Sequence, residues 1–192
     1  MRTLIASAFV SVDGVVDSPG GGAGENHRSA GWTFKDIEFL PEAYELAGRA
    51  MQEASGLMLG RVSYEAFSRV WPDMEDFAAM KDRPKYVVST TLSDDDLVGN
   101  WGPTTILRSL EEIAALKETD GGPIYTAGSA RLTRDLGDAG LIDRYDLLVF
   151  PVLLGGGKRM FSESDKEKQR LRLVEHEAYA NGIQKQVYEV LR

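Results

Sequence analysis

Short apolar runs alternate with segments of helical periodicity over most of the chain. Apolar and β-branched residues predict buried strands at Leu4–Val10, Leu57–Leu59, Lys85–Thr91, Thr104–Leu107, Pro123–Thr126 and Asp143–Val152. Between these runs, apolar residues recur at helical spacing after Pro41, over residues 62–70, after Ser109 and over residues 128–138. Strands that alternate with helices predict a largely parallel sheet with helices on both faces.

The C-terminal region has a different pattern. Apolar and polar residues alternate in Arg170–Ala178 and Lys185–Leu191, and the turn sequence Asn181-Gly182 lies between them. Two such segments without an intervening helix predict an antiparallel pair at one edge of the sheet. The chain is therefore predicted to form one α/β domain over residues 1–192, with about eight strands and about four helices.

Composition narrows the class of protein. Hydrophobic residues make up 43% and charged residues 27% of the 192 residues, which is typical of a folded domain. A formal net charge of −8 argues against binding to a nucleic-acid backbone. With no cysteine and two histidines, the chain lacks a disulfide framework, and we predict no metal site. Asp13 interrupts the N-terminal apolar run and no apolar stretch reaches about 18 residues, so we expect no membrane segment and a cytoplasmic location.

Three junctions that follow predicted strands carry residues suited to a phosphorylated ligand. In a parallel sheet, ligands bind at the carboxyl ends of the strands, where helix N-termini present free N–H groups to anions. The first junction is Leu59–Ser63, where Gly60 permits close backbone approach and the Arg61 guanidinium can bind a phosphate. The second, Val88–Thr91, ends in three hydroxyls, and the third, Thr126–Arg131, is a turn of small residues that opens a helix. Each alone could be a plain turn, a helix cap or a solvated arginine, whereas three at one sheet edge favour a dinucleotide or another phosphorylated ligand.

Other familiar motifs are absent or incomplete. The chain has no G-x-G-x-x-G sequence, and Val152 and Arg159 stand where a P-loop needs Gly and Ser or Thr. We interpret Gly155–Gly157 as a flexible turn and Ser18–Gly24 as a mobile surface loop that could act as a lid. Some other polar residues are of types that can act in catalysis or bind metal, but we interpret them as surface groups. They are His27, His176 and Asp94–Asp96.

Five segments together resemble the dihydrofolate reductase superfamily. In chain order they are Leu4–Gly14, Met58–Tyr64, Tyr86–Thr90, Ile124–Ala130 and Pro151–Phe161. The chain is most similar to the small stand-alone branch related to the reductase domain of riboflavin biosynthesis, and the resemblance extends from Met1 to Arg192. Each segment alone is a weak signal, whereas five in the same order are specific for fold and cofactor but not for substrate.

The resemblance implies an eight-stranded sheet that binds NADPH in an extended conformation. Relatives contact the phosphates and the adenine ribose at three places. The corresponding residues here are Gly60, Arg61 and Ser63 for the pyrophosphate and adenosine phosphate, Ser89, Thr90 and Arg108 around the adenine ribose and its 2′-phosphate, and Gly128, Ser129, Ala130, Arg131 and Leu132 for a second phosphate cradle.

The resemblance also implies how the reacting end of the cofactor is held. Phe9 and Val16 would offer backbone groups to the nicotinamide amide, and the loop from Asp13 to about Trp32 would close over the ring as a lid. A lid excludes water and holds the ring against the acceptor, as hydride transfer requires. By the same resemblance, Trp32, Tyr64 and Pro151 would contact the substrate, and the protein would be a homodimer.

The chain departs from its relatives where they bind substrate. Dihydrofolate reductases have a carboxylate on the first helix, a few residues past a Trp, and Asp36 follows Trp32 at one residue less than that spacing. Riboflavin-pathway reductases have Lys where this chain has Val15, and Glu where it has Ala127. These differences leave the substrate open between a pterin-like molecule, a ribosylaminopyrimidine-like molecule and another small carbonyl or imine.

The sequence therefore predicts an NADPH-dependent reductase that transfers hydride to a C=N or C=O carbon of a small molecule. The proton would come from water, from Asp36 or from Asp13. A rival hypothesis is a non-catalytic module that binds a nucleotide or another small ligand in the same cleft. A third is an interaction protein in which Trp71 and Trp101 line an oligomer seam.

Overall fold

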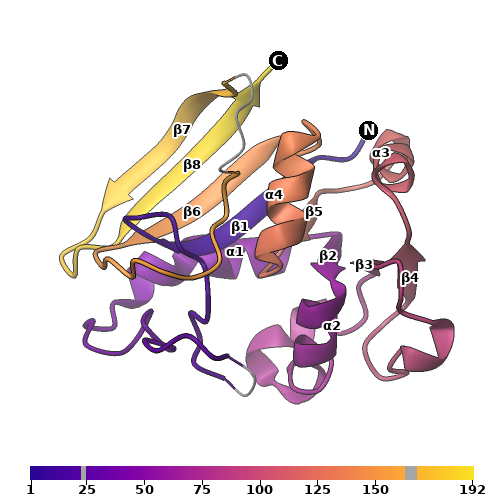
Figure 1. Cartoon of the computed structure of the whole chain (residues 1–192), viewed down its shortest axis with the longest axis horizontal. Coiled ribbons are helices and arrows are strands. Elements are labelled where there is room, and N and C mark those ends of the chain that lie inside the picture. The colour runs from indigo at the N-terminus through magenta and orange to yellow at the C-terminus, as the bar shows by residue number, and fades with distance from the viewer. Residues whose placement is uncertain (23–24, 163–167) are drawn as a thin grey trace.

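Eight strands form one mixed sheet in the order β4-β3-β2-β5-β1-β6-β8-β7 (Figure 1). The computed structural model describes residues 1–22, 25–162 and 168–192. Its strands are β1 (Leu4–Ser11), β2 (Gly56–Gly60), β3 (Lys85–Val88), β4 (Thr104–Leu107), β5 (Ile124–Thr126), β6 (Arg144–Phe150), β7 (Arg170–Ala178) and β8 (Gln184–Leu191). All pairs from β4 across to β6 are parallel, and β8 pairs antiparallel with both β6 and β7. The predicted α/β fold with an antiparallel C-terminal edge is therefore confirmed.

Helices cover both faces of the sheet (Figure 1). The α-helices in the described residues are α1 (Glu45–Glu53), α2 (Arg61–Phe67), α3 (Leu110–Glu118) and α4 (Ala130–Asp138), and 3-10 turns occur at Pro41–Tyr44, Trp71–Asp73, Glu75–Met80 and Asp94–Asp96. Successive residues of β1 show the two layers, because Leu4 belongs to the same buried cluster as Leu136 of α4, whereas Ile5 clusters with Ala50 of α1. Within the described ranges, no helix is long and apolar enough to cross a membrane.

The third strand is shorter than the sequence predicts. It ends at Val88 because the next residue, Ser89, closes a turn with its side chain. The Ser89 hydroxyl accepts the backbone N–H groups of Thr91 and Leu92 at 3.1 and 3.0 Å. The predicted strand through Thr91 is thus wrong by three residues, and the hydroxyl-rich segment is a turn at the carboxyl end of β3.

Trp101 lies in the core, so the prediction that it lines an oligomer seam is wrong. Its side chain is fully buried and its ring stacks on Tyr64, with a centroid separation of 5.8 Å. The ammonium of Lys85, itself fully buried, lies 4.8 Å from the Trp101 ring centroid. Trp71 remains half-buried, and its ring is sandwiched between those of Phe67 and Phe77 at 4.1 and 4.0 Å. These rings extend the core on the α1 side of the sheet.

Candidate functional site

Two turns at the carboxyl edge of the sheet are joined by reciprocal hydrogen bonds. The turn from β2 into the first turn of α2 contains Gly60 and Ser63, and the turn from β5 into α4 contains Gly128 and Ser129. The Ser129 hydroxyl accepts the Gly60 N–H at 2.9 Å, and the Ser63 hydroxyl accepts the Ser129 N–H at 3.0 Å. The structure therefore brings four of the predicted cofactor residues together in one unit.

The backbone of the second turn requires small residues. Gly128 and Ser129 both have left-handed conformations, with φ of +61° and +57°. A Cβ atom at Gly128 would lie 3.2 Å from the Phe67 ring and 3.2 Å from the Ser63 hydroxyl oxygen. The absence of a side chain thus lets the two turns approach each other, and the chain then enters α4 with its first amides at this edge.

Positive groups surround these turns. The N-terminus of α4 carries a partial positive charge, and Ala130 and Leu132 are buried so that they anchor its first turn. The Arg61 and Arg131 side chains are 48% and 88% exposed, and each lies 3.7 or 3.8 Å from a carboxylate one helical turn later. The charge of Arg61 also helps to lower the pKa of Asp96. Such exposed pairs are weak, so both guanidinium groups are available to an anion.

The ends of β3 and β4 form a third part of the site. The guanidinium of Arg108 donates to the backbone carbonyl of Ser89 at 2.7 Å and joins the two strand ends. The Ser89 side chain is buried and its hydroxyl oxygen holds the turn, whereas the side chain of Thr90 is exposed to solvent. The structure thus favours Thr90 and Arg108 over Ser89 as direct contacts for a ligand.

Asp13 acts as an acceptor and not as a proton donor. Its carboxylate accepts the Ser11 hydroxyl at 2.6 Å and the backbone N–H groups of Leu154 and Gly155 at 3.1 and 2.7 Å. The bond from Ser11, together with these amides, lowers the pKa of Asp13 to about 2. The carboxylate is ionised at neutral pH, so the predicted role of Asp13 as a proton source does not fit. It fastens the segment after β1 to the segment after β6.

Asp36 stays exposed and lies before the first helical turn. Its backbone is left-handed, with φ of +61°, in a turn that precedes Pro41–Tyr44. The predicted position near the start of the first helix is therefore displaced, since the chain turns between Asp36 and that helix. Its carboxylate makes no hydrogen bond or ion pair to any of the described residues, which leaves it accessible.

The predicted substrate residues have different environments. Trp32 is 4% exposed, its indole N–H donates to the Asp17 carbonyl at 2.8 Å, and its ring packs edge-on against Phe150. Tyr64 is 1% exposed and its hydroxyl accepts the Val98 N–H at 3.0 Å. The structure places both side chains in the core, so it does not support direct substrate contact by either. Pro151 is exposed at the carboxyl end of β6.

The residues predicted to face the nicotinamide lie on and just after β1. Phe9 is half-buried, and its ring packs edge-on against Tyr44 and Phe150 at centroid distances of 5.9 and 5.5 Å. The Val16 N–H already donates to the Lys158 carbonyl at 2.9 Å. Val16 therefore has its carbonyl and not its amide to offer a ligand.

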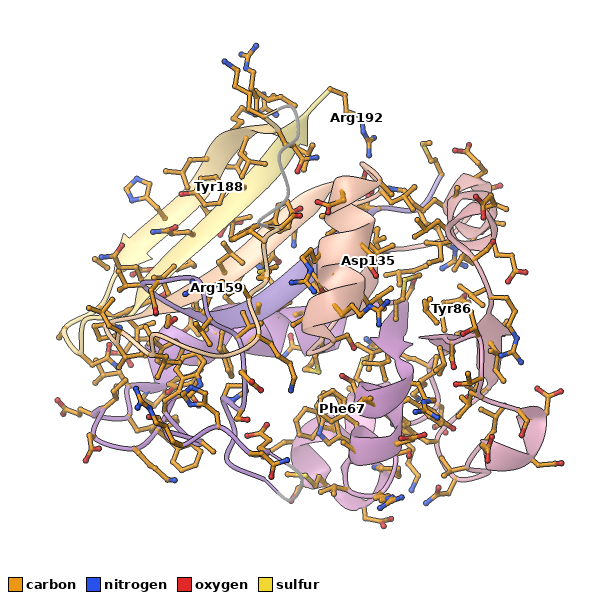
Figure 2. All side chains as sticks on the ribbon, in the orientation of Figure 1. Phe67, Tyr86, Asp135, Arg159, Tyr188 and Arg192 are labelled. Atoms are coloured by element: carbon orange, nitrogen blue, oxygen red, sulfur yellow. The ribbon has the colours of Figure 1, made fainter. Side chains whose placement is uncertain are left out.

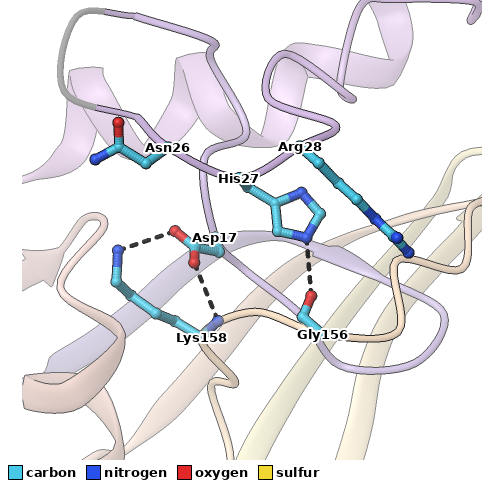
Figure 3. Close-up of a pocket in the computed structure, with 6 residues that line it drawn as sticks. All are labelled: Asp17, Asn26, His27, Arg28, Gly156 and Lys158. Atoms are coloured by element: carbon cyan, nitrogen blue, oxygen red, sulfur yellow. Dashed lines mark hydrogen bonds and ion pairs between the residues drawn. The ribbon is translucent and has the colours of Figure 1, made fainter.

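The sequence did not predict the pocket next to Val16. It has a volume of about 520 Å³ and is lined by Asp17, Asn26, His27, Arg28, Gly156 and Lys158 (Figure 3). Arg159, the residue after Lys158, is labelled in the view of the whole chain (Figure 2). Within the glycine run beside it, Gly157 is closely packed, because a Cβ there would lie 2.7 Å from Val15 and 3.3 Å from His27, whereas a Cβ at Gly155 or Gly156 would meet nothing within 4 Å. The described part of the Ser18–Gly24 loop is also held, since Ser18 is buried and its hydroxyl accepts the His27 N–H at 3.2 Å; residues 23–24 lie outside the described ranges. The sequence feature that could have indicated this pocket is the run of three glycines followed by two basic residues in Gly155–Arg159.

Solved structures share this fold and define the class of the protein. A protein assigned to riboflavin biosynthesis from Shewanella sp. PV-4 superposes with a TM-score of 0.75 at 19% identity, with 100% of each chain covered. Dihydrofolate reductase from Enterococcus faecalis, complexed with NADP(H) and RAB-propyl, gives a TM-score of 0.57 at 17% identity over 99% of this chain and 97% of that one. A pyrimidine reductase-like protein from Corynebacterium diphtheriae gives 0.59 at 14% identity over 100% and 92%. The chain thus has a dihydrofolate-reductase-like fold.

Sequence comparison identifies the family. The model of the RibD C-terminal domain matches residues 2–185, and the chain belongs to this family. A relative in Bacillus subtilis (strain 168), Uncharacterized protein YyaP, is 25% identical over 194 residues, which cover 97% of this chain and 94% of that protein. The predicted resemblance is confirmed, and the chain has the fold of a family of reductases.

Proposed function

We propose that the protein is an NADPH-dependent reductase that transfers hydride to a C=N or C=O carbon of a small molecule. The observation that carries the proposal is the joined pair of turns at the carboxyl edge of the sheet. A hydroxyl that accepts a backbone N–H keeps its own proton free to donate, so Ser63 and Ser129 present two oriented O–H groups to an anion. Beside them are the α4 N-terminus and the exposed guanidinium groups of Arg61 and Arg131.

These groups fit a dinucleotide diphosphate. Gly60, Ser63 and Gly128–Leu132 would hold the pyrophosphate, while Thr90 and Arg108 would bind the 2′-phosphate of the adenine ribose. When bound, the nicotinamide supplies the hydride. The contribution of this chain is to hold the diphosphate, to exclude water with the segment fastened by Asp13, and to admit a proton. Because Asp13 is ionised, that proton comes from water or from the exposed Asp36.

Nucleotide binding tests the proposal directly. Tryptophan fluorescence is followed during titration with NADPH and NADH, since the chain contains three Trp residues. We expect saturable binding that Arg61→Ala weakens about tenfold, as loss of a charge-assisted contact predicts. Arg170→Ala, on the edge strand β7, is the matched control and should bind as the native chain does, because β5, β1, β6 and β8 separate β7 from β2 in the sheet. Failure to bind either nucleotide would refute the cofactor assignment.

Catalysis is tested separately from binding. NADPH oxidation is measured with pterins, ribosylaminopyrimidines and simple carbonyl compounds as acceptors. Turnover of any acceptor supports a reductase, whereas tight NADPH binding without turnover of any of them supports the rival hypothesis of a nucleotide-binding module. Both outcomes require the same site at the carboxyl edge of the sheet.

We also propose that the protein is a homodimer, on the basis of its family resemblance. The edge strand β7 is exposed along nearly all of its length, with large apolar side chains at Leu171, Leu173 and Val174. Exposed strand edges of this kind invite pairing with another chain. Light scattering should give the mass of two chains of 21.1 kDa, and a monomeric mass would contradict the proposal.

A further inference from the structure

The outer side of the edge strand β7 is open to solvent. This strand is the last in the sheet order and pairs with β8, and no other element of the described residues lies beyond it (Figure 1). All of its residues are exposed except Glu175, which is half-buried. An edge strand of this length presents a row of unpaired backbone N–H and C=O groups, which can pair with a strand of another chain.

The charged residues of β7 occur in a self-complementary order. The first half of the strand carries Arg170 and Arg172, and the second half carries Glu175 and Glu177. Charges on an edge strand usually oppose pairing, because a neighbour of the same sign repels them. In an antiparallel pair of two copies, however, the first half of one strand lies beside the second half of the other. Each arginine can then meet a glutamate.

A bulge puts these four charges on one face of the sheet. In chain order, their partners on β8 are Leu191, Glu189, Val187 and Lys185. These partners are every second residue of β8, so they share a face, and the four charges share it with them. Arg172 and Glu175 are three positions apart, and they share this face because the register shift between Leu173 and Glu175 adds one residue. They therefore meet the condition that opposing residues of an antiparallel pair lie on the same face.

We propose that two copies of this chain associate by antiparallel pairing of their β7 strands, about a two-fold axis between Leu173 and Val174. The inference rests on the homodimer proposed above and assigns its contact surface. Arg170 then lies opposite Glu177 of the second copy, and Arg172 lies opposite Glu175 of the second copy. It is the one register in which all four charges of β7 meet an opposite charge on the other β7.

Ion pairs within each copy extend this pattern. Arg172 pairs with Glu189 of β8, and Glu175 pairs with the Arg49 guanidinium at 3.1 Å. Contact between Arg172 of one copy and Glu175 of the other joins these two pairs into a row of four charges that alternate in sign. A network of this kind is stabilised more than an isolated surface pair.

Arg170 gains the most from the pairing. It makes no hydrogen bond or ion pair to any of the described residues. Glu177 has a partner in its own chain, the ammonium of Lys185 at 3.0 Å, and its side chain is still 53% exposed. The proposed register therefore gives Arg170 a carboxylate partner without breaking a contact within the chain.

Apolar side chains surround the proposed axis. Leu171, Leu173 and Val174 are 38%, 46% and 41% exposed, although all three are large and apolar. Leu171 and Leu173 lie opposite Val190 and Tyr188 of β8, which pack against the core on the α4 side of the sheet. In the proposed register Leu173 lies opposite Val174 of the second copy, on each side of the axis. The pairing thus removes apolar surface from water at its centre.

Exchange of charges tests the pairing. Light scattering gives the mass of each protein over a dilution series. Arg170→Glu puts two glutamates opposite each other, and Glu177→Arg puts two arginines opposite each other, so each variant alone should associate about tenfold or more weakly. An equimolar mixture of the two variants restores opposite charges and should associate as the native chain does. Arg69→Glu, at an exposed arginine after α2, makes the same change in net charge as Arg170→Glu and should leave association unchanged.

Cross-linking tests the register. The native chain has no cysteine, so introduced thiols are the ones that diamide can oxidise to a disulfide. Leu171→Cys and His176→Cys variants, mixed in equal amounts, should form a disulfide between copies, because these positions lie opposite each other across the axis. Neither variant alone should cross-link. Leu171→Cys mixed with Ala178→Cys is the matched control, since those positions oppose each other only after a shift of two residues.

The outcomes separate this inference from the homodimer itself. If the native chain is a monomer, both are wrong. If the native chain is a dimer but the charge variants associate like it and Leu171→Cys does not cross-link to His176→Cys, the homodimer stands and pairing through β7 is wrong. Cross-linking to Ala178→Cys in place of His176→Cys would contradict the register. None of these results bears on the reductase proposal, because no nucleotide is present.

Discussion

The backbone amide of Ser129 donates to the hydroxyl of Ser63 across 3.0 Å, although the two residues are 66 positions apart in the sequence. The reverse contact, from the Gly60 N–H to the Ser129 hydroxyl, ties the same two turns at 2.9 Å. Each turn thus supplies the partner that the other turn needs to satisfy a backbone donor. We therefore expect stability and affinity for the proposed cofactor to be coupled at this edge of the sheet.

Ser63→Ala should weaken both properties. It removes the acceptor of the Ser129 N–H, which should lower the free energy of unfolding by about 1 kcal/mol. It also removes an oriented O–H donor, so the Kd for NADPH should rise about tenfold. Urea unfolding and fluorescence titration measure the two effects. Ser63→Thr keeps the hydroxyl and should lie close to the native protein; equal NADPH affinity in the Ala variant would mean that Ser63 is only structural.

Gly128→Ala tests the close approach of the two turns. The new Cβ would lie 3.2 Å from both Phe67 and the Ser63 hydroxyl, in a backbone with φ of +61°. Gly140 has a similar φ of +68° with nothing within 4 Å of a built Cβ, so Gly140→Ala isolates the backbone strain. We expect about 1 kcal/mol of destabilisation for Gly140→Ala and about 1–3 kcal/mol more for Gly128→Ala. Equal losses in urea unfolding would show that the turn relaxes around the methyl group.

Short-range patterns were enough to predict most of the fold and the turns at the carboxyl ends of β2 and β5. β4 and β7 have the bounds that alternation and turn residues predict, and Gly60 and Gly128 stand where parallel strands end. These features depend on neighbours in the sequence. The end of β3 was predicted wrongly because the Ser89 hydroxyl accepts a backbone N–H that would otherwise be available to the sheet. The pattern of apolar and polar residues does not reveal such a side-chain hydrogen bond.

The environments of the residues predicted to act near the substrate are set by contacts between segments that are distant in the sequence. Tyr64 follows Ser63 directly, yet it faces Trp101 in the core, and helical spacing does not say which side of a short helix meets the ligand. The sequence predicted Asp13 as a possible proton source, whereas the structure shows that its carboxylate accepts the backbone N–H groups of Leu154 and Gly155. The pocket at Arg28 likewise exists only because the two loops meet.

Asp13→Asn should weaken a pH-dependent interaction between the segment after β1 and the segment after β6. The folded-state pKa of Asp13 is about 2, below its ordinary value of 3.8, so the folded state favours the ionised carboxylate. Its contribution to stability is complete above the unfolded-state pKa and is lost as the pH falls from about 4 toward about 2. The native chain should therefore be more stable than Asp13→Asn at pH 7, and the difference should shrink over that acid range.

Unfolding curves at a series of pH values measure this difference. Asp95→Asn, at an exposed carboxylate of the Asp94–Asp96 turn, is the matched control and should show little difference at any pH. A stability difference for Asp13→Asn that does not change between pH 5 and pH 2 would contradict the assignment of Asp13 as an ionised acceptor.

Lys85→Met should be among the more destabilising single changes in the core. The buried Lys85 ammonium donates to the carbonyl oxygens of Met80, Lys81 and Arg83 at 2.5, 2.8 and 2.8 Å, and it lies over the Trp101 ring. Methionine has a similar length but no donor, so three carbonyl oxygens lose their partner. We expect the free energy of unfolding to fall by about 2–4 kcal/mol. Lys81→Met alters the neighbouring, half-buried side chain and should cost less than about 1 kcal/mol. Similar urea midpoints for the two variants would show that the carbonyl groups are satisfied without Lys85.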